Sequence, residues 1–144
     1  PFVEAVHAKG LGYGLHLVHG IPKEAAEKRL QILGTAFTAD QLVAEPPCET
    51  FIGDYWRINT KHPGAQAYYD SLVSMWAEQG IDFIYFDGAV GGERCRCRSA
   101  ARKTGSEVIE PGRNCECDIQ AVALMANSIR KFGRGMFFYA AFGP

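Results

Sequence analysis

The stretch IDFIYFDGAVGG, residues 81 to 92, joins a strongly apolar run to a single carboxylate, Asp87, which glycines follow at once. A nearly continuous apolar run without alternation is typical of a strand that a parallel sheet buries on both faces. In parallel α/β folds, ligands bind at the carboxyl ends of the strands. Because an unpaired buried carboxylate is costly, we expect Asp87 to face a functional site, with a helix cap or loop position as the alternative.

Helix-like and strand-like segments alternate on both sides of this strand. Helices are expected over residues 2–9, 22–33, 63–79 and 118–133, and strands over residues 12–20, 81–87 and 136–142. Residues 34–62 carry turn signals, and residues 91–117 form a polar insertion. The order α, β, α, β, α, β predicts an α/β fold with parallel strands and helices outside them. An open doubly wound sheet and a barrel of βα units both fit this order.

Composition indicates one globular domain rather than a nucleic-acid-binding or membrane protein. The chain has 144 residues, of which 47% are hydrophobic, and its formal net charge is −1. A charge near zero gives no basic footprint for nucleic acid. No apolar run approaches the roughly 18 residues of a membrane span. We therefore expect no nucleic-acid partner and no membrane span.

Four of the five cysteines are clustered in the insertion as CRC and CEC, namely Cys95, Cys97, Cys115 and Cys117. Two disulfides in a secreted or extracellular protein are the preferred interpretation, and the pairing stays open. A zinc site is the alternative, but zinc loops usually have C-x2-C spacing, so no metal is expected. Cys48 stands alone in either scheme.

Several blocks of the sequence resemble the alpha-galactosidase (melibiase) family of glycoside hydrolases, and most closely its plant and bacterial branch. The similarity covers nearly the whole chain except the insertion. The blocks that carry it, in chain order, are VHAKGLGYGLHLVHGIPKEA, NTKHPGAQAYYDSL, AEQGIDFIYFDGAVGG and GRGMFFYAAFGP.

The resemblance implies a (β/α)8 TIM barrel to which this chain contributes about strands three to five. Residues 1–144 would then form a partial barrel domain with a Cys-rich insertion at about residues 91–117. Asp87 would be the nucleophile of a retaining mechanism that cleaves terminal α-galactosides. The general acid would lie on a strand outside this chain, and no cofactor is implied. The remaining strands are expected from the same or another chain, so this chain alone is expected to be inactive.

Four further residues are expected to bind the carbohydrate. His16 matches a pocket-lining position of the family, and Tyr85 stands where the family has a lysine. Trp56 is expected to offer an aromatic platform to a sugar, and Asp54 to grip a hydroxyl group. Tyr85 and the altered end of the fifth strand, YAAFGP, favour an alternative function. That alternative is a catalytically degenerate, secreted structural or glycan-binding domain within a larger assembly.

Overall fold

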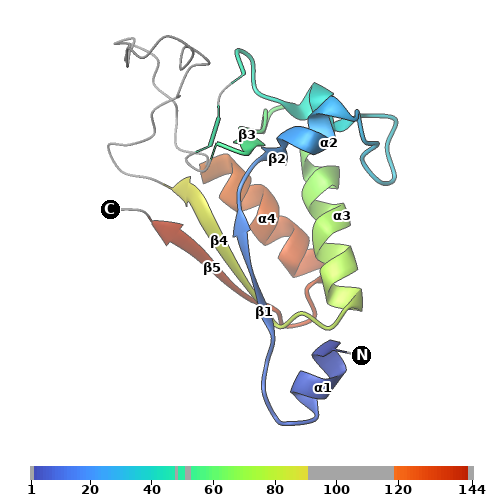
Figure 1. Ribbon diagram of the computed structural model, residues 1–144, viewed down its shortest axis with the longest axis vertical. Helices are drawn as coiled ribbons and strands as arrows, with labels where there is room; N and C mark the ends of the chain where they lie inside the picture. The colour runs from blue at the N-terminus through green and yellow to red at the C-terminus, as the bar shows by residue number, and fades with distance from the viewer. Residues whose placement is uncertain (1, 48, 51–52, 91–118, 143–144) are drawn as a thin grey trace.

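The computed structural model describes residues 2–47, 49–50, 53–90 and 119–142 and has a parallel α/β architecture (Figure 1). Three parallel strands form the main sheet in the order β1 (Gly14–Val18), β4 (Phe83–Val90) and β5 (Phe137–Phe142). A short antiparallel ribbon pairs β2 (Ile21–Pro22) with β3 (Tyr55–Trp56). The predicted α/β fold with parallel strands is confirmed for these residues.

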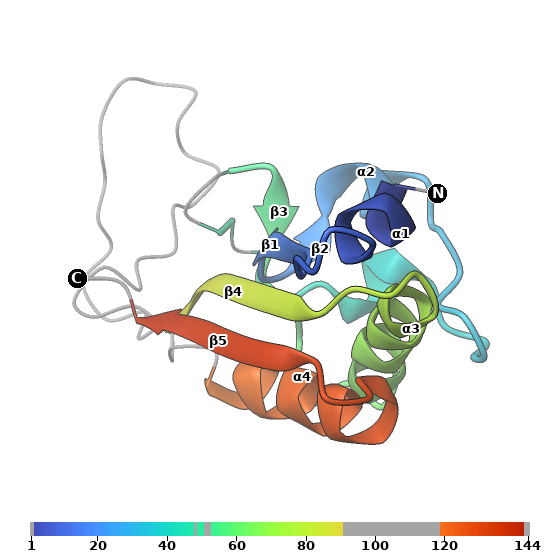
Figure 2. The same ribbon diagram turned by 90° about the horizontal axis from the view of Figure 1, so that it is seen from below.

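Helices α3 (Ala65–Glu78) and α4 (Ile119–Phe132) precede β4 and β5, respectively, and cover one face of the main sheet (Figure 2). The other helices are α1 (Phe2–His7), which precedes β1, and α2 (Lys23–Glu27), which follows β2, with a 3-10 helix η1 (Ala39–Leu42) between α2 and β3. Among the residues that the structure describes, no helix is long and apolar enough to cross a membrane.

The expected helix over residues 22–33 is wrong beyond α2. Arg29 has a φ of 49°, a left-handed value that an α-helix cannot continue through. The chain then folds back, and the Ile32 amide donates to the Phe37 carbonyl at 2.9 Å. The central strand differs from its prediction as well, because β4 continues past Asp87 to Val90.

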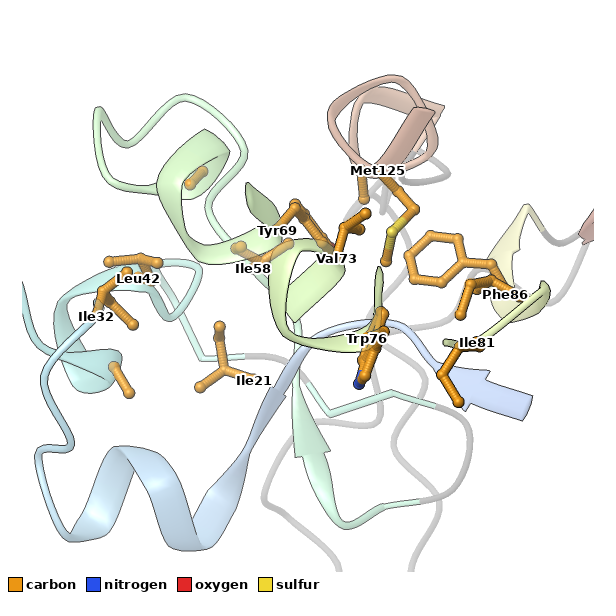
Figure 3. Close-up of a cluster of buried hydrophobic side chains, with 14 of the residues drawn as sticks. Ile21, Ile32, Leu42, Ile58, Tyr69, Val73, Trp76, Ile81, Phe86 and Met125 are labelled. Carbon is orange, nitrogen blue, oxygen red and sulfur yellow. The ribbon is translucent and has the colours of Figure 1, made fainter. Parts of the chain in front are cut away.

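The core lies between the sheet and the helices α3 and α4 (Figure 3). Tyr69, Val73 and Trp76 follow one another at helical spacing on α3 and are buried. Met125 of α4 is fully buried, and the Phe86 ring of β4 lies 6.1 Å from the Tyr69 ring. Helical and strand periodicities therefore direct these side chains into one cluster.

The opposite face of the sheet is aromatic and open. Side chains alternate between the two faces of a strand, so Phe83 and Phe137 lie side by side away from α3 and α4. Their rings stack at 5.5 Å, and Phe137 is 65% exposed. Gly14 of the neighbouring strand makes room for this pair, because a Cβ atom there would lie 2.6 Å from the Phe83 ring.

A polar network joins α3 to α4 at one side of the core. Ser128 of α4 is fully buried, and its hydroxyl donates to Asp70 Oδ1 at 2.6 Å. Gln66 Nε2 donates to the same oxygen at 2.9 Å, and Lys131 Nζ lies 2.9 Å from Asp70 Oδ2. Burial raises the pKa of Asp70, but the hydrogen bonds from Ser128, Lys131 and Gln66 together outweigh it and lower this pKa overall.

A second carboxylate fixes the amino end of the sheet. Asp82 precedes β4, and its Oδ2 accepts hydrogen bonds from the Tyr13 amide and from His7 Nε2, each at 2.7 Å. The Asp82 amide donates to the Tyr13 carbonyl at 2.8 Å. The Tyr13 amide, and after it His7, lower the pKa of Asp82. The segment before β1 is thereby tied to the start of β4.

Replacement of Met125 by alanine is expected to lower the free energy of unfolding by about 2–5 kcal/mol, because a fully buried side chain leaves a cavity. Met75→Ala is the matched control, since Met75 is also helical but 43% exposed, and it should cost less than about 1 kcal/mol. Urea denaturation of both variants measures the difference. Equal losses of stability would contradict the described core.

Asp70 is expected to make the stability of the protein sensitive to acid. Its folded-state pKa is lowered, so the stability it contributes is complete above the ordinary carboxyl value of 3.8 and is lost as the pH falls through the lower folded value. Asp70→Asn removes this dependence. Denaturation midpoints of wild type and variant should therefore keep a constant difference down to about pH 4 and converge only as the pH falls further. Midpoints that fall in parallel would show that the Asp70 network does not carry this effect.

Candidate functional site

Asp87 lies where the regular pairing of the main sheet ends. It is opposite Val18, the last residue of β1, and the His19 amide donates to the Asp87 carbonyl at 3.1 Å. On the other side, the register with β5 shifts between Phe86 and Val90. The Asp87 side chain is 27% exposed, so its carboxylate is half-buried at the carboxyl end of the middle strand.

An imidazole from the neighbouring strand contacts this carboxylate. His16 Nε2 lies 3.1 Å from Asp87 Oδ2, although 71 residues separate the two in the chain. His16 is also opposite Tyr85 in the register of β1 and β4. Their rings meet edge to face at 4.8 Å. His16, Tyr85 and Asp87, which were all predicted as site residues, are therefore brought together.

Aromatic rings continue the site across all three strands. Tyr85 is opposite Tyr139 of β5, and their ring centroids lie 5.3 Å apart. An open concavity of about 460 Å³ lies against this row, and the residues that line it are Gly14, Leu15, His16, Phe83 and Tyr85. Carbohydrate pyranose rings have apolar faces that pack on aromatic rings of this kind. Tyr139 is 49% exposed and remains accessible on this side.

The remaining two predicted binding residues are Trp56, on β3 of the ribbon, and Asp54, directly before β3. The ribbon follows the carboxyl end of β1 (Figure 1). Asp54 is exposed, and its carbonyl accepts a hydrogen bond from the Lys23 amide at 3.0 Å. The Trp56 ring is half-buried, and Lys23 Nζ lies 4.5 Å from its centre. One face of this predicted platform is thus in contact with an ammonium group.

Sequence reasoning missed Lys23 and Glu49, which form an ion pair beside Trp56. Neither residue stands in a motif that marks it, because strand pairing places both beside Trp56. The strand β2, which precedes Lys23, pairs with β3, and Glu49 forms an antiparallel bridge with Trp56. A cation held between a carboxylate and an indole face is a stable arrangement, and it fixes the orientation of Trp56. This pair therefore defines which side of the indole is accessible.

The expected disulfide cysteines lie outside the described residues, as does Cys48. The alternative of a zinc site at these cysteines falls outside them too. Among the residues that are described, no three His, Cys, Asp or Glu side chains gather as they would around a metal ion.

Neither the family models nor the curated proteins give a match to this sequence. Solved structures do. The crystal structure of a proposed alpha-N-acetylgalactosaminidase from Bacillus halodurans C-125 matches with a TM-score of 0.77 and 24% identity. A GH27 β-L-arabinopyranosidase from Geobacillus stearothermophilus matches with a TM-score of 0.74 and 25% identity. A variant of that enzyme in complex with arabinose matches with a TM-score of 0.73 and 24% identity.

These matches cover the whole of this chain but only a fraction of the similar proteins. The chain spans 29% of the Bacillus halodurans protein and 28% of each Geobacillus stearothermophilus chain. The expected resemblance to the alpha-galactosidase family is confirmed, and the fold is that of a fragment of its glycoside hydrolases.

Gly20 links β1 to the ribbon, and Gly20→Ala is expected to destabilise this part of the site. Its φ is +110°, and a Cβ atom there would lie 2.4 Å from the Trp56 carbonyl oxygen. Gly34→Ala is the control, because Gly34 also has a positive φ of +76° but no atom within 4 Å of the added Cβ. Thermal or urea denaturation should show an additional loss of about 1–3 kcal/mol for Gly20→Ala. Equal losses would argue against the close approach of the ribbon.

Proposed function

We propose that this chain is the part of a retaining glycoside hydrolase that supplies the nucleophile, Asp87, and that the complete enzyme cleaves terminal α-galactosides or related glycans. The observation that carries the proposal is the half-buried Asp87 carboxylate at the carboxyl end of the middle strand, beside His16 and Tyr85. A carbohydrate ligand is supported by the similar structure that contains arabinose. No cofactor enters the proposed reaction.

In the proposed reaction, one Asp87 oxygen attacks the anomeric carbon of the bound sugar. The bond from that carbon to the leaving oxygen breaks, and its electron pair stays on the leaving oxygen, which takes a proton from a general acid. Water then attacks the same carbon of the glycosyl-enzyme, and the general acid, now a base, takes a proton from that water. The bond from the carbon to the Asp87 oxygen breaks, and its electron pair stays on that oxygen, which restores the carboxylate. Retaining enzymes hold the two carboxyl groups about 5 Å apart. The second carboxyl group is proposed to come from a strand outside this chain.

The sugar is proposed to rest on the side of the sheet that α3 and α4 leave open. The ring centroids of Tyr85 and Tyr139 lie 5.3 Å apart, and the two rings offer an aromatic surface. Tyr85 is on β4, the strand that also carries Asp87, and Tyr139 is its partner on β5. Asp54 and Trp56 of the ribbon are proposed to reach the same ligand from the carboxyl end of β1. Because Tyr85 and Tyr139 offer aromatic rings and hydroxyl groups, this part of the site suits a neutral sugar.

The rest of a (β/α)8 barrel is proposed to cover the open face, with β1, β4 and β5 as strands three to five. Phe137 is 65% and Tyr139 49% exposed on that face, and β1 and β5 are edges of the described sheet. Exposed edges and large apolar patches call for a covering structure. The remaining strands come from the same or another chain, in a secreted or extracellular protein.

The second candidate is a catalytically degenerate domain that binds glycans or serves a structural role within a larger assembly. The observation that favours it is that the aromatic row beside Asp87, which consists of Tyr85 and Tyr139, contains no cationic side chain. Tyr85 brings no cation toward the carboxylate, and its ring packs on Tyr139 instead. Such a site would bind a sugar through its rings without cleaving it.

Asp87→Asn in the full-length protein is expected to abolish hydrolysis of an aryl α-galactoside, with a loss of at least about 10³-fold in kcat, because an amide cannot form the glycosyl-enzyme. Release of the aryl group measures the reaction. Glu78→Gln is the matched control, since Glu78 is an exposed carboxylate at the last residue of α3, and it should retain full activity.

The two candidate functions predict different results in the same assay. Turnover by wild type that Asp87→Asn removes supports the hydrolase. Sugar binding by wild type without any turnover of aryl glycosides supports the degenerate domain. Turnover that survives in Asp87→Asn would rule out Asp87 as the nucleophile.

A further inference from the structure

The His16 imidazole occupies a position from which it controls the Asp87 carboxylate rather than the sugar. Its Nε2 atom lies 3.1 Å from Asp87 Oδ2. An ionised carboxylate only accepts hydrogen bonds, so Nε2 must carry the proton in this contact. Asp87 Oδ1 has no such contact with His16. The two oxygens of the carboxylate are therefore distinguished by their surroundings.

We propose that His16 is a positioning residue for the nucleophile, an inference that rests on the proposed function of Asp87. Its Nε2–H group holds Oδ2, which fixes the rotation of the carboxylate and turns Oδ1 toward the anomeric carbon. Attack requires the reacting atoms to be about 3–3.5 Å apart and aligned. A carboxylate that is anchored through one oxygen keeps the other in that alignment.

The imidazole is itself held by its neighbours. The Tyr85 ring meets it at 4.8 Å with an interplanar angle of 85°, and Tyr139 packs behind Tyr85 at 5.3 Å. Strand pairing sets this row, because the three residues are register partners across β1, β4 and β5. The orientation of His16 thus follows from the sheet.

The Asp87 backbone is fixed as well. The His19 amide donates to the Asp87 carbonyl at 3.1 Å, and β1 ends opposite Asp87. The rotations about the Cα–Cβ and Cβ–Cγ bonds of Asp87 are left for a side chain to restrict. His16 restricts them by its hydrogen bond to Oδ2. Because the His16 side chain is 61% exposed, this bond contributes little to stability and its role is geometric.

Two substitutions separate this role from direct contact with the sugar. In the His16→Gln variant, the side-chain amide nitrogen is separated from Cβ by as many bonds as the imidazole Nε2 is in wild type. It too can donate to Asp87 Oδ2. The amide nitrogen of His16→Asn is one bond nearer Cβ and cannot reach. In the full-length protein, His16→Asn should lower kcat about 10²-fold, whereas His16→Gln should stay within about tenfold of wild type. KM for an aryl α-galactoside should change little in both.

A measurement without turnover tests the contact itself. Nitrogen-15 NMR of the imidazole groups should show the His16 proton on Nε2 in wild type, with the His16→Gln spectrum identifying the signal. Asp87→Ala removes the acceptor and should abolish that tautomer preference. An unchanged preference would overturn the proposal, as would equal losses of kcat in the two His16 variants or a change confined to KM.

The proposal and the proposed function fail in different ways. If wild type hydrolyses the substrate and Asp87→Asn does not, while His16→Asn retains full kcat, the nucleophile stands and the role of His16 is wrong. If wild type hydrolyses no glycoside, there is no nucleophile to position, and both are wrong.

Discussion

Burial of the Phe86 ring against α3 determines which side of the sheet carries Asp87. Neighbouring residues of a strand point to opposite faces, so Phe86 in the core places Asp87 on the open side. A shift of one residue would expose Phe86 and bury an unpaired carboxylate, both of which are unfavourable. Parallel pairing carries the same alternation to β1 and β5, where it sets His16 and Tyr139 beside Tyr85. The site is thus a consequence of the packing on the other face.

The sequence predicts the elements whose patterns are strong and local. Periodicity and flanking residues predict α3 and α4 to within two residues, and apolar runs predict β4 and β5. The segment after α2 differs, since its apolar residues Leu30 and Leu33 are 52% and 74% exposed rather than buried on a helix face. The left-handed backbone at Arg29 and the antiparallel bridge between Gln31 and Thr38 override the helical propensity there.

The candidate site also has parts that the sequence predicts and parts that it does not. Asp87 can be recognised because it ends an apolar run, and the carboxyl ends of parallel strands are where ligands bind. Its contact with His16 depends on the register between two strands that are 71 residues apart, and the sequence does not encode that register locally. The Lys23–Glu49 pair beside Trp56 also depends on pairing between distant segments. Single residues are therefore predictable, whereas their geometric relations require the structure.

The two ends of the main sheet have different constraints. At the amino end, Asp82 ties the Tyr13 backbone and His7 to the start of β4, and a change there disturbs the connection of two elements. At the carboxyl end, Ile21 of the ribbon is fully buried in the core, whereas the side chains of His16, Tyr85 and Tyr139 lie on the open face of the sheet. Substitutions in this open row that keep the strand pairing should therefore disturb the fold less than a substitution of Asp82. Over evolution, the open row can thus vary more freely than the amino end, where selection on folding acts.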